Sequence, residues 1–196
     1  MTIGASFNQF RDAGPDDVPG APAIRLANLW YYLEQRRDAD IVAVGEAAGY
    51  QGMRWSGIAF TSEFDLLERW GGAPYRRSSR RDRPWKEPSG TIVHGLLEQL
   101  GAERRVILWN VVPTHPHDDG RERSNRHPTQ AEIREGIPYA ERLIAIVQPQ
   151  RLIAIGRVAE RALADHKLHS VRHPAQSGAT AFRVGMRAEL EALDQF

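Results

Sequence analysis

The stretch Asp40-Ile41-Val42-Ala43-Val44-Gly45-Glu46-Ala47-Ala48-Gly49 (DIVAVGEAAG) decides the fold that this sequence predicts. Its first half is a short, continuous apolar run, which is expected of a strand buried on both faces. Its second half changes to glycine, glutamate and alanine, which predicts a turn where the strand ends. A strand of this kind belongs in a parallel sheet that helices cover on both sides.

Three further apolar runs resemble this one. They lie at residues 105–112, 151–155 and, more weakly, 169–172. Helical patterns separate or flank the runs, because apolar side chains recur there at three- and four-residue spacing. The predicted helices cover residues 23–37, 91–100, 129–147, 157–166 and 179–193.

Two of these helices carry further expectations. In the helix at 23–37 the side chains available for burial are Ile24, Leu26, Leu29, Trp30 and Leu33. Ser89 is a candidate cap for the helix at 91–100. Strands that alternate with helices predict an α/β fold, a three-layer α/β/α sandwich around a central, mostly parallel four-stranded sheet. The length of 196 residues suits one well-buried core, so we expect residues 1–196 to form a single domain.

Composition excludes several classes of protein. The chain has no cysteine, which excludes disulfides, thiolate nucleophiles and cysteine-ligated zinc or iron–sulfur sites. No apolar run approaches the roughly 20 residues that span a bilayer, so we expect no membrane segment. The first 20 residues lack a basic region followed by an apolar one, so we expect no secretory signal and a cytoplasmic location.

The cations are almost all arginine, since Lys86 and Lys167 are the only lysines. The guanidinium group binds phosphate through a planar fork, which suits a nucleic-acid partner, although a genome rich in G and C would produce the same bias. Segment 71–90 fits no predicted helix or strand. It is either a solvated, flexible loop or a loop that binds phosphates. Its cations are Arg76, Arg77, Arg80, Arg81, Arg83 and Lys86, interleaved with Tyr75 and Trp85.

The carboxyl ends of the predicted strands carry the chemistry. In an open parallel sheet the ligand binds beyond these ends. Residues 45–52 (GEAAGYQG) follow the first strand, and Gly57-Ile58-Ala59-Phe60 comes shortly afterwards. Asn110 lies at the end of the second strand, and residues 173–179 (HPAQSGA) follow the fourth.

In this order the segments resemble the motifs of the uracil-DNA glycosylase superfamily, over roughly Ile41 to Ala181. GEAAG followed by Gly-x-x-Phe resembles the GEAPG…GxPF pattern of the iron–sulfur branches. Asn110-Val111-Val112 is similar to the uracil-binding Asn segment, and HPAQSGA is similar to the final His-Pro loop. The absence of cysteine places the chain in a branch without the cluster. The resemblance implies that a flipped base lies at the strand ends.

The resemblance also implies a role for each matching residue. Asn110 would bind the edge of uracil, because its amide has both a donor and an acceptor. Phe60 would stack on the flipped base, although an ordinary core phenylalanine is the alternative. His173 would donate a hydrogen bond to the uracil O2, where negative charge collects on bond cleavage. Glu46 would position water and support the sugar cation, or else be a turn residue, while Ala47 stands where another branch has a catalytic Asp.

Further expectations concern specificity and DNA contacts. Tyr50 or Gln51 would exclude the methyl group of thymine. The cluster at 114–119 (THPHDD) matches no zinc spacing, so we favour a loop over the base or the DNA strand rather than a metal site. We therefore expect no metal and no cofactor. The DNA-binding candidates are Arg76, Arg77, Arg80, Arg81, Lys86, Arg172, Gln176, Ser177 and Gly178.

The leading hypothesis is a monomeric, monofunctional uracil-DNA glycosylase that acts on uracil-containing DNA and releases free uracil, leaving an abasic site. Three alternatives stay open. The base could be hypoxanthine, xanthine or mismatched thymine. The protein could bind uracil or abasic sites without catalysis, since Ala47 cannot activate water. A metal-dependent nucleotide hydrolase ranks last, because only Glu46 and the pair Asp118-Asp119 offer carboxylates.

Overall fold

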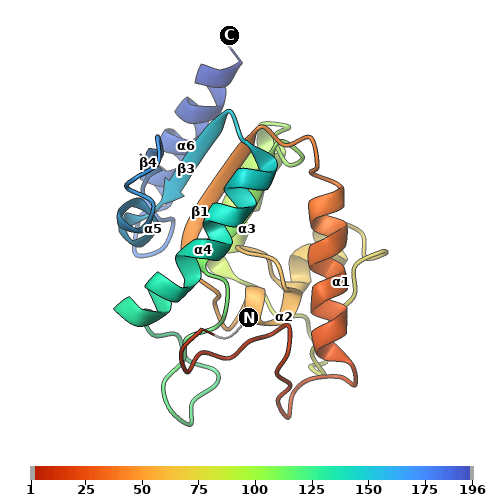
Figure 1. Ribbon diagram of the computed structural model, residues 1–196. Coiled ribbons are helices and arrows are strands. Elements are labelled where there is room, and N and C mark those ends of the chain that lie inside the picture. The colour runs from red at the N-terminus through yellow and green to blue at the C-terminus, as the bar shows by residue number, and fades with distance from the viewer. Residues whose placement is uncertain (1–2, 195–196) are drawn as a thin grey trace.

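Four parallel strands form the centre of the protein, in the order β2-β1-β3-β4 (Figure 1). The structure is a computed structural model that describes residues 3–194. The strands are β1 (Ile41–Ala47), β2 (Val106–Val112), β3 (Arg151–Ile155) and β4 (His169–Val171). This arrangement confirms the predicted α/β class and the parallel four-stranded sheet.

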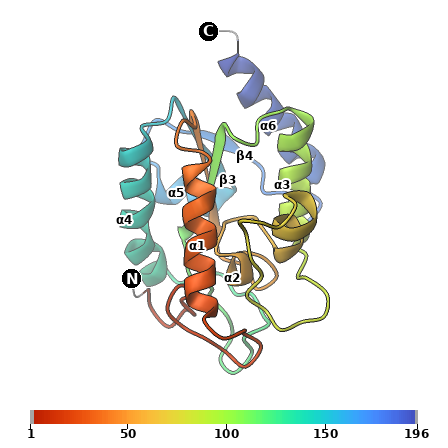
Figure 2. The ribbon, with the colours of Figure 1, turned by 90° about the vertical axis from the view of Figure 1, so that its right-hand side faces the viewer.

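Helices cover both faces of the sheet, which makes three layers (Figure 2). One face packs against α1 (Ala21–Glu34), α4 (Gln130–Val147) and α5 (Arg157–Ala162). The other face packs against α3 (Pro88–Gln99) and α6 (Ala179–Leu193). Two short helices, α2 (Met53–Ser56) and η1 (Asp65–Arg69), lie in the connection between β1 and α3. Among residues 3–194, no helix is both long and apolar enough to cross a membrane.

The central strand β1 divides the core in two because its side chains alternate between the faces of the sheet. Val42 and Val44 are buried on the face that α1 and α4 cover. Ile41 and Ala43 are buried on the face that α3 and α6 cover. Burial on both faces explains why the run reads as continuously apolar in the sequence.

Several boundaries differ from the sequence predictions. β1 continues through Ala47, since Gly45 and Ala47 pair with Asn110 and Val112 of β2. The predicted turn residues at the start of GEAAG are therefore strand residues. α3 begins at Pro88 with Glu87 as its N-cap, so Ser89 lies inside the helix and does not cap it. α5 ends at Ala162, earlier than predicted.

The buried face predicted for α1 was partly wrong. Leu26 and Trp30 are 54% and 66% exposed, whereas Arg25 and Asn28 are almost fully buried. The reason is that this helix packs partly on polar loops rather than only on the apolar sheet. Arg25 forms an ion pair with Asp17 at 2.8 Å. Asn28 donates to the carbonyl oxygens of Ser56 and Arg76, so its amide is satisfied where an apolar side chain would leave those groups unpaired.

Segment 71–90 is not simply a solvated loop. Its last three residues belong to α3, and Tyr75, Ser78, Ser79 and Trp85 are buried. The carboxylate of Glu63 accepts hydrogen bonds from the backbone N–H groups of Ser78 and Ser79 and from the Ser79 hydroxyl, at 2.6–2.8 Å. A carboxylate that receives several such bonds fixes the loop from within. Arg76, Arg80, Arg81 and Arg83 are exposed, whereas Arg77 is half-buried and donates to the carbonyl oxygen of Ser79, so the phosphate-binding prediction stays open.

We predict that Gly136→Ala destabilises the protein, because a β-carbon there would overlap the carbonyl oxygen of Val111 where α4 packs on β2. Overpacking of this kind costs about 1–3 kcal/mol in the free energy of unfolding. The measurement is urea denaturation at equilibrium. The control is Gly95→Ala on α3, where a β-carbon meets nothing within 4 Å and helix propensity should raise stability by up to about 1 kcal/mol. Equal stabilities of the two variants would contradict this account of the packing.

Candidate active site

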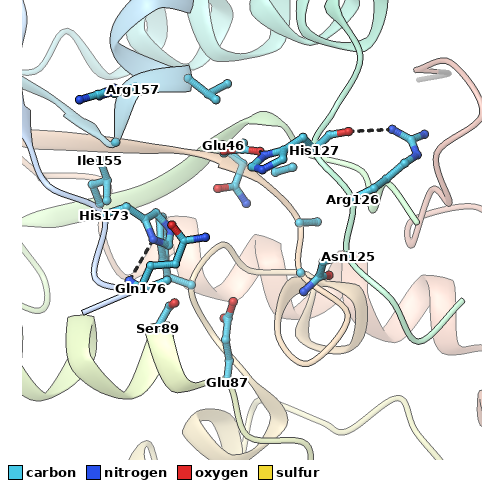
Figure 3. Close-up of a pocket in the computed structure, with 18 of the residues that line it drawn as sticks. Glu46, Glu87, Ser89, Asn125, Arg126, His127, Ile155, Arg157, His173 and Gln176 are labelled. Atoms are coloured by element: carbon cyan, nitrogen blue, oxygen red, sulfur yellow. Dashed lines mark hydrogen bonds and ion pairs between the residues drawn. The ribbon is translucent and has the colours of Figure 1, made fainter. Parts of the chain in front are cut away.

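A cavity of about 740 Å³ opens at the carboxyl ends of the strands (Figure 3). Its walls come from the ends of β1, β2 and β3, the start of α3, the loop before α4, and the loop after β4. This is where an open parallel sheet presents its ligand site. The lining residues are Glu46, Ala47, Ala48, Gly49, Phe60, Glu87, Ser89, Asn110, Asn125, Arg126, His127, Ile155, Gly156, Arg157, Val158, Arg172, His173, Ala175 and Gln176.

Two glycines allow an aromatic ring to lie against the strand ends. A β-carbon on Gly45 would overlap the ring of Phe60 and come within 2.8 Å of Asn110 Oδ1. A β-carbon on Gly90 would overlap the backbone oxygen of Phe60. Phe60 itself has a φ of 51°, a left-handed conformation that is uncommon for a bulky residue and that clusters at functional sites. The ring therefore forms part of the cavity wall.

Asn110 lies next to this ring, because its partner across the β1–β2 pairing is Gly45. The residue is 3% exposed, and its Nδ2 atom is 3.3 Å from the sulfur of Met53. A thioether is a weak hydrogen-bond acceptor. The amide of Asn110 thus keeps most of its hydrogen-bonding capacity for a ligand in the cavity.

His173 presents a hydrogen-bond donor to the same cavity. The backbone N–H of Ala175 donates to its Nδ1 atom at 3.1 Å, so the proton of the neutral ring is assigned to Nε2. Burial lowers the pKa of the imidazole, Glu46 opposes this shift, and Arg172 reinforces it. The ring centroids of His173 and Phe60 are 5.8 Å apart. His173 is therefore a neutral Nε2–H donor beside the aromatic wall at pH 7.

Glu46 has a histidine partner that the sequence analysis did not predict. Its Oε1 atom lies 2.7 Å from Nδ1 of His127, whose side chain is 87% exposed. The loop that carries His127 is fixed by the neighbouring Arg126, which donates to both carboxylate oxygens of Glu132 at 2.7 Å. Glu132 also completes a capping box with Thr129 at the start of α4. A rigid helix start thus positions the partner of Glu46.

Glu87 is a second carboxylate in the cavity wall and was also not predicted. Its Oε2 atom is buried without a hydrogen-bond partner among the described residues. Burial, with a smaller contribution from Asp65, raises the pKa of this carboxyl to about 7. Beside it, Asn125 Oδ1 accepts a hydrogen bond from the backbone N–H of Tyr50 at 2.9 Å. In Figure 3 the side chains of Glu87 and Asn125 lie on the same side of the cavity.

The structure brings together most of the predicted site residues. Glu46, Ala47, Phe60, Asn110 and His173 all line the cavity. Arg172 and Gln176 line it as well, with Ser177 and Gly178 next in the same loop. Cavity residues that the sequence analysis missed are Glu87, Ser89, Asn125, His127 and Arg157. No motif marked them, because they come from loops and helix starts that only the folded chain brings to the strand ends.

Other predicted residues lie outside the cavity wall. Tyr50 contacts Trp85 edge-on, with ring centroids 5.7 Å apart, and neither Tyr50 nor Gln51 lines the cavity. Gly49 and Glu87 occupy that side of it instead. Two of the predicted DNA-binding cations stack on aromatic rings: Arg81 on Trp85 at 3.9 Å and Lys86 on Phe64 at 4.2 Å. Like Arg76, Arg77 and Arg80, they are not among the residues that line the cavity.

The cluster at 114–119 folds into the protein rather than over the cavity. His115 is fully buried, and its Nε2 atom lies 2.9 Å from the carbonyl oxygen of Ser124. Asp118 forms an ion pair with Arg121 at 2.7 Å. In the part of the chain that the structure describes, no group of three or more His, Asp or Glu side chains is placed to hold a metal ion.

We predict a pH-dependent stability that Glu87→Gln removes. The raised pKa means that the folded state keeps a proton that the unfolded chain releases above its ordinary value of 4.5. Stability therefore falls as the pH rises from about 4.5 to about 7, by on the order of 1–3 kcal/mol, and is constant above that range. Denaturation curves for wild type and Glu87→Gln at pH 5, 6, 7 and 8 measure the difference. Glu98→Gln, on the exposed side of α3, is the control, and identical pH slopes for wild type and Glu87→Gln would contradict the prediction.

Comparison with known proteins gives relatives that match part of the chain. This chain is 30% identical over 127 residues to the type-4 uracil-DNA glycosylase of Pyrobaculum aerophilum. The match covers 61% of this chain and 60% of that protein. It is 32% identical over 89 residues to the type-4 uracil-DNA glycosylase of Sulfurisphaera tokodaii, which covers 44% and 38%. The matches thus span less than two thirds of the length of these relatives.

Structural and family comparisons cover more of the chain. The crystal structure of wild-type Pedobacter heparinus SMUG2 superposes with a TM-score of 0.70, covering 100% of this chain and 92% of that one. At 15% sequence identity this similarity concerns the fold. The family model described as the uracil DNA glycosylase superfamily matches residues 33–193, which include every strand and the whole cavity wall. The chain therefore belongs to the uracil DNA glycosylase superfamily.

Proposed function

We propose that this protein is a monofunctional DNA glycosylase that hydrolyses the N-glycosidic bond of uracil flipped out of DNA, leaving an abasic site and free uracil. One observation carries the proposal. A single cavity holds an amide that is only weakly engaged, an aromatic wall and a neutral imidazole N–H donor, from Asn110, Phe60 and His173. The names of the two relatives, both type-4 uracil-DNA glycosylases, support uracil as the base.

Binding of the base follows from the chemistry of these groups. The ring of Phe60 replaces part of the stacking that the base loses when it leaves the duplex. The amide of Asn110 offers a donor and an acceptor, which matches the neighbouring carbonyl and N–H of the uracil edge. Cytosine has an amino group and an unprotonated ring nitrogen at these positions, so it pairs only with the amide turned over, which removes the contact of Nδ2 with the Met53 sulfur. This mismatch is the basis of selectivity against the normal base.

Bond cleavage separates charge, and each charge has a protein partner. The C1′–N1 bond breaks with its electron pair passing to the base, so that negative charge gathers on the base oxygen. The Nε2–H of His173 donates to that oxygen, and no proton has to move because the ring is already neutral. The carboxylate of Glu46 stabilises the cationic sugar. Water then adds to C1′ and releases a proton, while the departing uracil anion takes one up.

With alanine at position 47, Glu46 is the carboxylate proposed to position the attacking water. Where another branch of the family has a catalytic Asp, alanine offers no group to orient or deprotonate water. In a largely dissociative reaction the cation attracts water strongly, so a positioned carboxylate is sufficient. The hydrogen bond from His127 fixes the orientation of this carboxylate. His127 is therefore a positioning residue that acts through Glu46.

The DNA strand would lie across the mouth of the cavity. Arg172 and Gln176 line the cavity from the last loop, and Arg157 lines it from the start of α5. The exposed cations of segment 71–90 are further candidates for contacts to neighbouring phosphates. Contacts of this kind release counterions, so binding should weaken as salt is raised.

The first experiment is excision of uracil from a labelled oligonucleotide in EDTA, followed by alkaline cleavage of abasic sites. We expect wild type to cut at uracil, and His173→Ala to lower kcat by roughly 100-fold because it removes the donor to the base oxygen. Asn110→Ala should lower kcat/KM by about tenfold or more, since it removes the contacts to the base edge. His169→Ala is the matched control, because this histidine of β4 pairs with Glu189 of α6 and does not line the cavity.

The outcomes separate the candidate functions. Binding of uracil-containing DNA without scission, on single strands or on duplexes, would favour a non-catalytic binding protein. Scission at hypoxanthine, xanthine or mismatched thymine but not at uracil would keep the reaction and change the base. Full activity of His173→Ala would contradict the assigned role of that residue.

We predict that His127→Ala lowers kcat by about three- to tenfold with little change in KM, which is the effect of losing one hydrogen bond to a catalytic carboxylate. Single-turnover cleavage at saturating enzyme measures the rate of the bond-breaking step. The control is His166→Ala, a partly exposed histidine that follows α5 and does not line the cavity. An unchanged single-turnover rate in His127→Ala would show that Glu46 needs no such positioning.

A further inference from the structure

The carboxyl group of Glu87 does not cap the helix that it precedes. It belongs to the N-cap residue of α3, where a side-chain oxygen ordinarily accepts hydrogen bonds from the first N–H groups of the helix. No such cap bond is made here. The Oε2 atom is buried and has no hydrogen-bond partner among the described residues. Its Oε2 atom lies beside Gly52 and Gly90, whereas its Oε1 atom lies beside Gly49, which lines the cavity together with Glu87.

The GEAAGYQG loop leaves room for this carboxyl by having glycine at two positions. A β-carbon on Gly52 would overlap Glu87 Oε2. A β-carbon on Gly49 would come within 3.1 Å of Glu87 Oε1 and within 4.0 Å of Asn125 Oδ1. Any larger residue at either position would therefore displace the carboxyl. Backbone and carboxyl fit each other, although no hydrogen bond joins them.

An arrangement of this kind costs stability. Leaving a buried polar atom unpaired typically costs about 1–3 kcal/mol. A buried polar atom without a hydrogen-bond partner is therefore expected mainly where a ligand supplies the missing bond. Glu87 is in the wall of the same cavity that holds Asn110, Phe60 and His173. Of its two oxygens, Oε1 is the one that lies beside a residue of the cavity wall, Gly49.

We propose that Glu87 contacts the flipped base directly and helps to determine specificity, its protonated carboxyl donating a hydrogen bond to a carbonyl oxygen of the base. The inference rests on the proposed glycosylase function and extends it. The favoured substrates are bases with a carbonyl at that position, as deamination produces, rather than bases with an amino group. An acid O–H aimed at a carbonyl gains a hydrogen bond, whereas an ionised carboxylate in the same place repels it.

The charges around Glu87 are compatible with a neutral acid near pH 7. Burial raises its pKa to about 7, with a smaller contribution from Asp65 of η1. Lys86 precedes it in the chain, but the ammonium group lies over the ring of Phe64. The other titratable groups that line the cavity come from β1, the loop before α4, α5 and the last loop: Glu46, Arg126, His127, Arg157, Arg172 and His173.

The test is the pH dependence of uracil excision by wild type, Glu87→Gln and Glu87→Ala between pH 5.5 and 8.5, with kcat and KM measured separately. Wild-type kcat/KM should fall above about pH 7, by roughly tenfold at pH 8.5, as the donor is lost. Glu87→Gln keeps a donor of the same shape that does not titrate. It should match wild type within about threefold at pH 6 and lose the alkaline decline. Glu87→Ala should lose about tenfold in kcat/KM at pH 6, mainly through KM.

Glu98→Gln on α3 is the matched control, because it makes the same change on the exposed side of the same helix. Thermal melts of all variants identify any that fail to fold, and the comparison of Gln with wild type remains decisive if Glu87→Ala is unstable. An alkaline decline that persists unchanged in Glu87→Gln, while wild type excises uracil, overturns the role of Glu87 alone. Wild type that releases no base from any substrate overturns this inference together with the proposed function.

Discussion

The pairing of β1 with β2 is the constraint on which the rest of the site depends. Both strands are buried and parallel, so their registered ends place Gly45 directly opposite Asn110. The missing side chain at Gly45 leaves space that Phe60 fills, and Phe60 accepts a left-handed backbone to do so. His173 then meets this ring from the far end of the chain. One glycine in a central strand thus sets the distances among the groups proposed to bind the base.

Polar groups inside the loops hold the other walls of the cavity in place. Glu63 fixes segment 71–90 through backbone N–H groups, and Asp17 pairs with the buried guanidinium groups of Arg25 and Arg54. Glu132 fixes the loop that carries His127 through its ion pair with Arg126. Each carboxylate is satisfied by several donors, so these loops are supported without a large apolar core. Precise loops matter here, because they supply the residues that the strands do not.

The carboxyl groups of Glu46 and Glu87 line the same cavity but have different surroundings. Glu46 lies at a strand end, where its Oε1 atom is 2.7 Å from Nδ1 of His127. The Oε2 atom of Glu87 is buried without a hydrogen-bond partner in the described part of the chain, and burial raises the pKa of this carboxyl to about 7. Glu46 therefore has a histidine beside it, whereas the Oε2 atom of Glu87 has no hydrogen-bond partner among residues 3–194. In the mechanism proposed above, the first serves the sugar cation and the second serves the base.

The sequence by itself determined the sheet, the helix order and the strand-end residues Glu46, Asn110 and His173, because apolar runs buried on both faces and the motifs that follow them are local signals. It did not determine the face that α1 buries, where Leu26 is exposed and Arg25 is buried, since that depends on distant loops. Only the tertiary structure decided that His127 meets Glu46 and that Glu87 lines the cavity. Those contacts join segments about 40 to 80 residues apart, and no local pattern encodes a pairing made by loops that meet only after the sheet has formed.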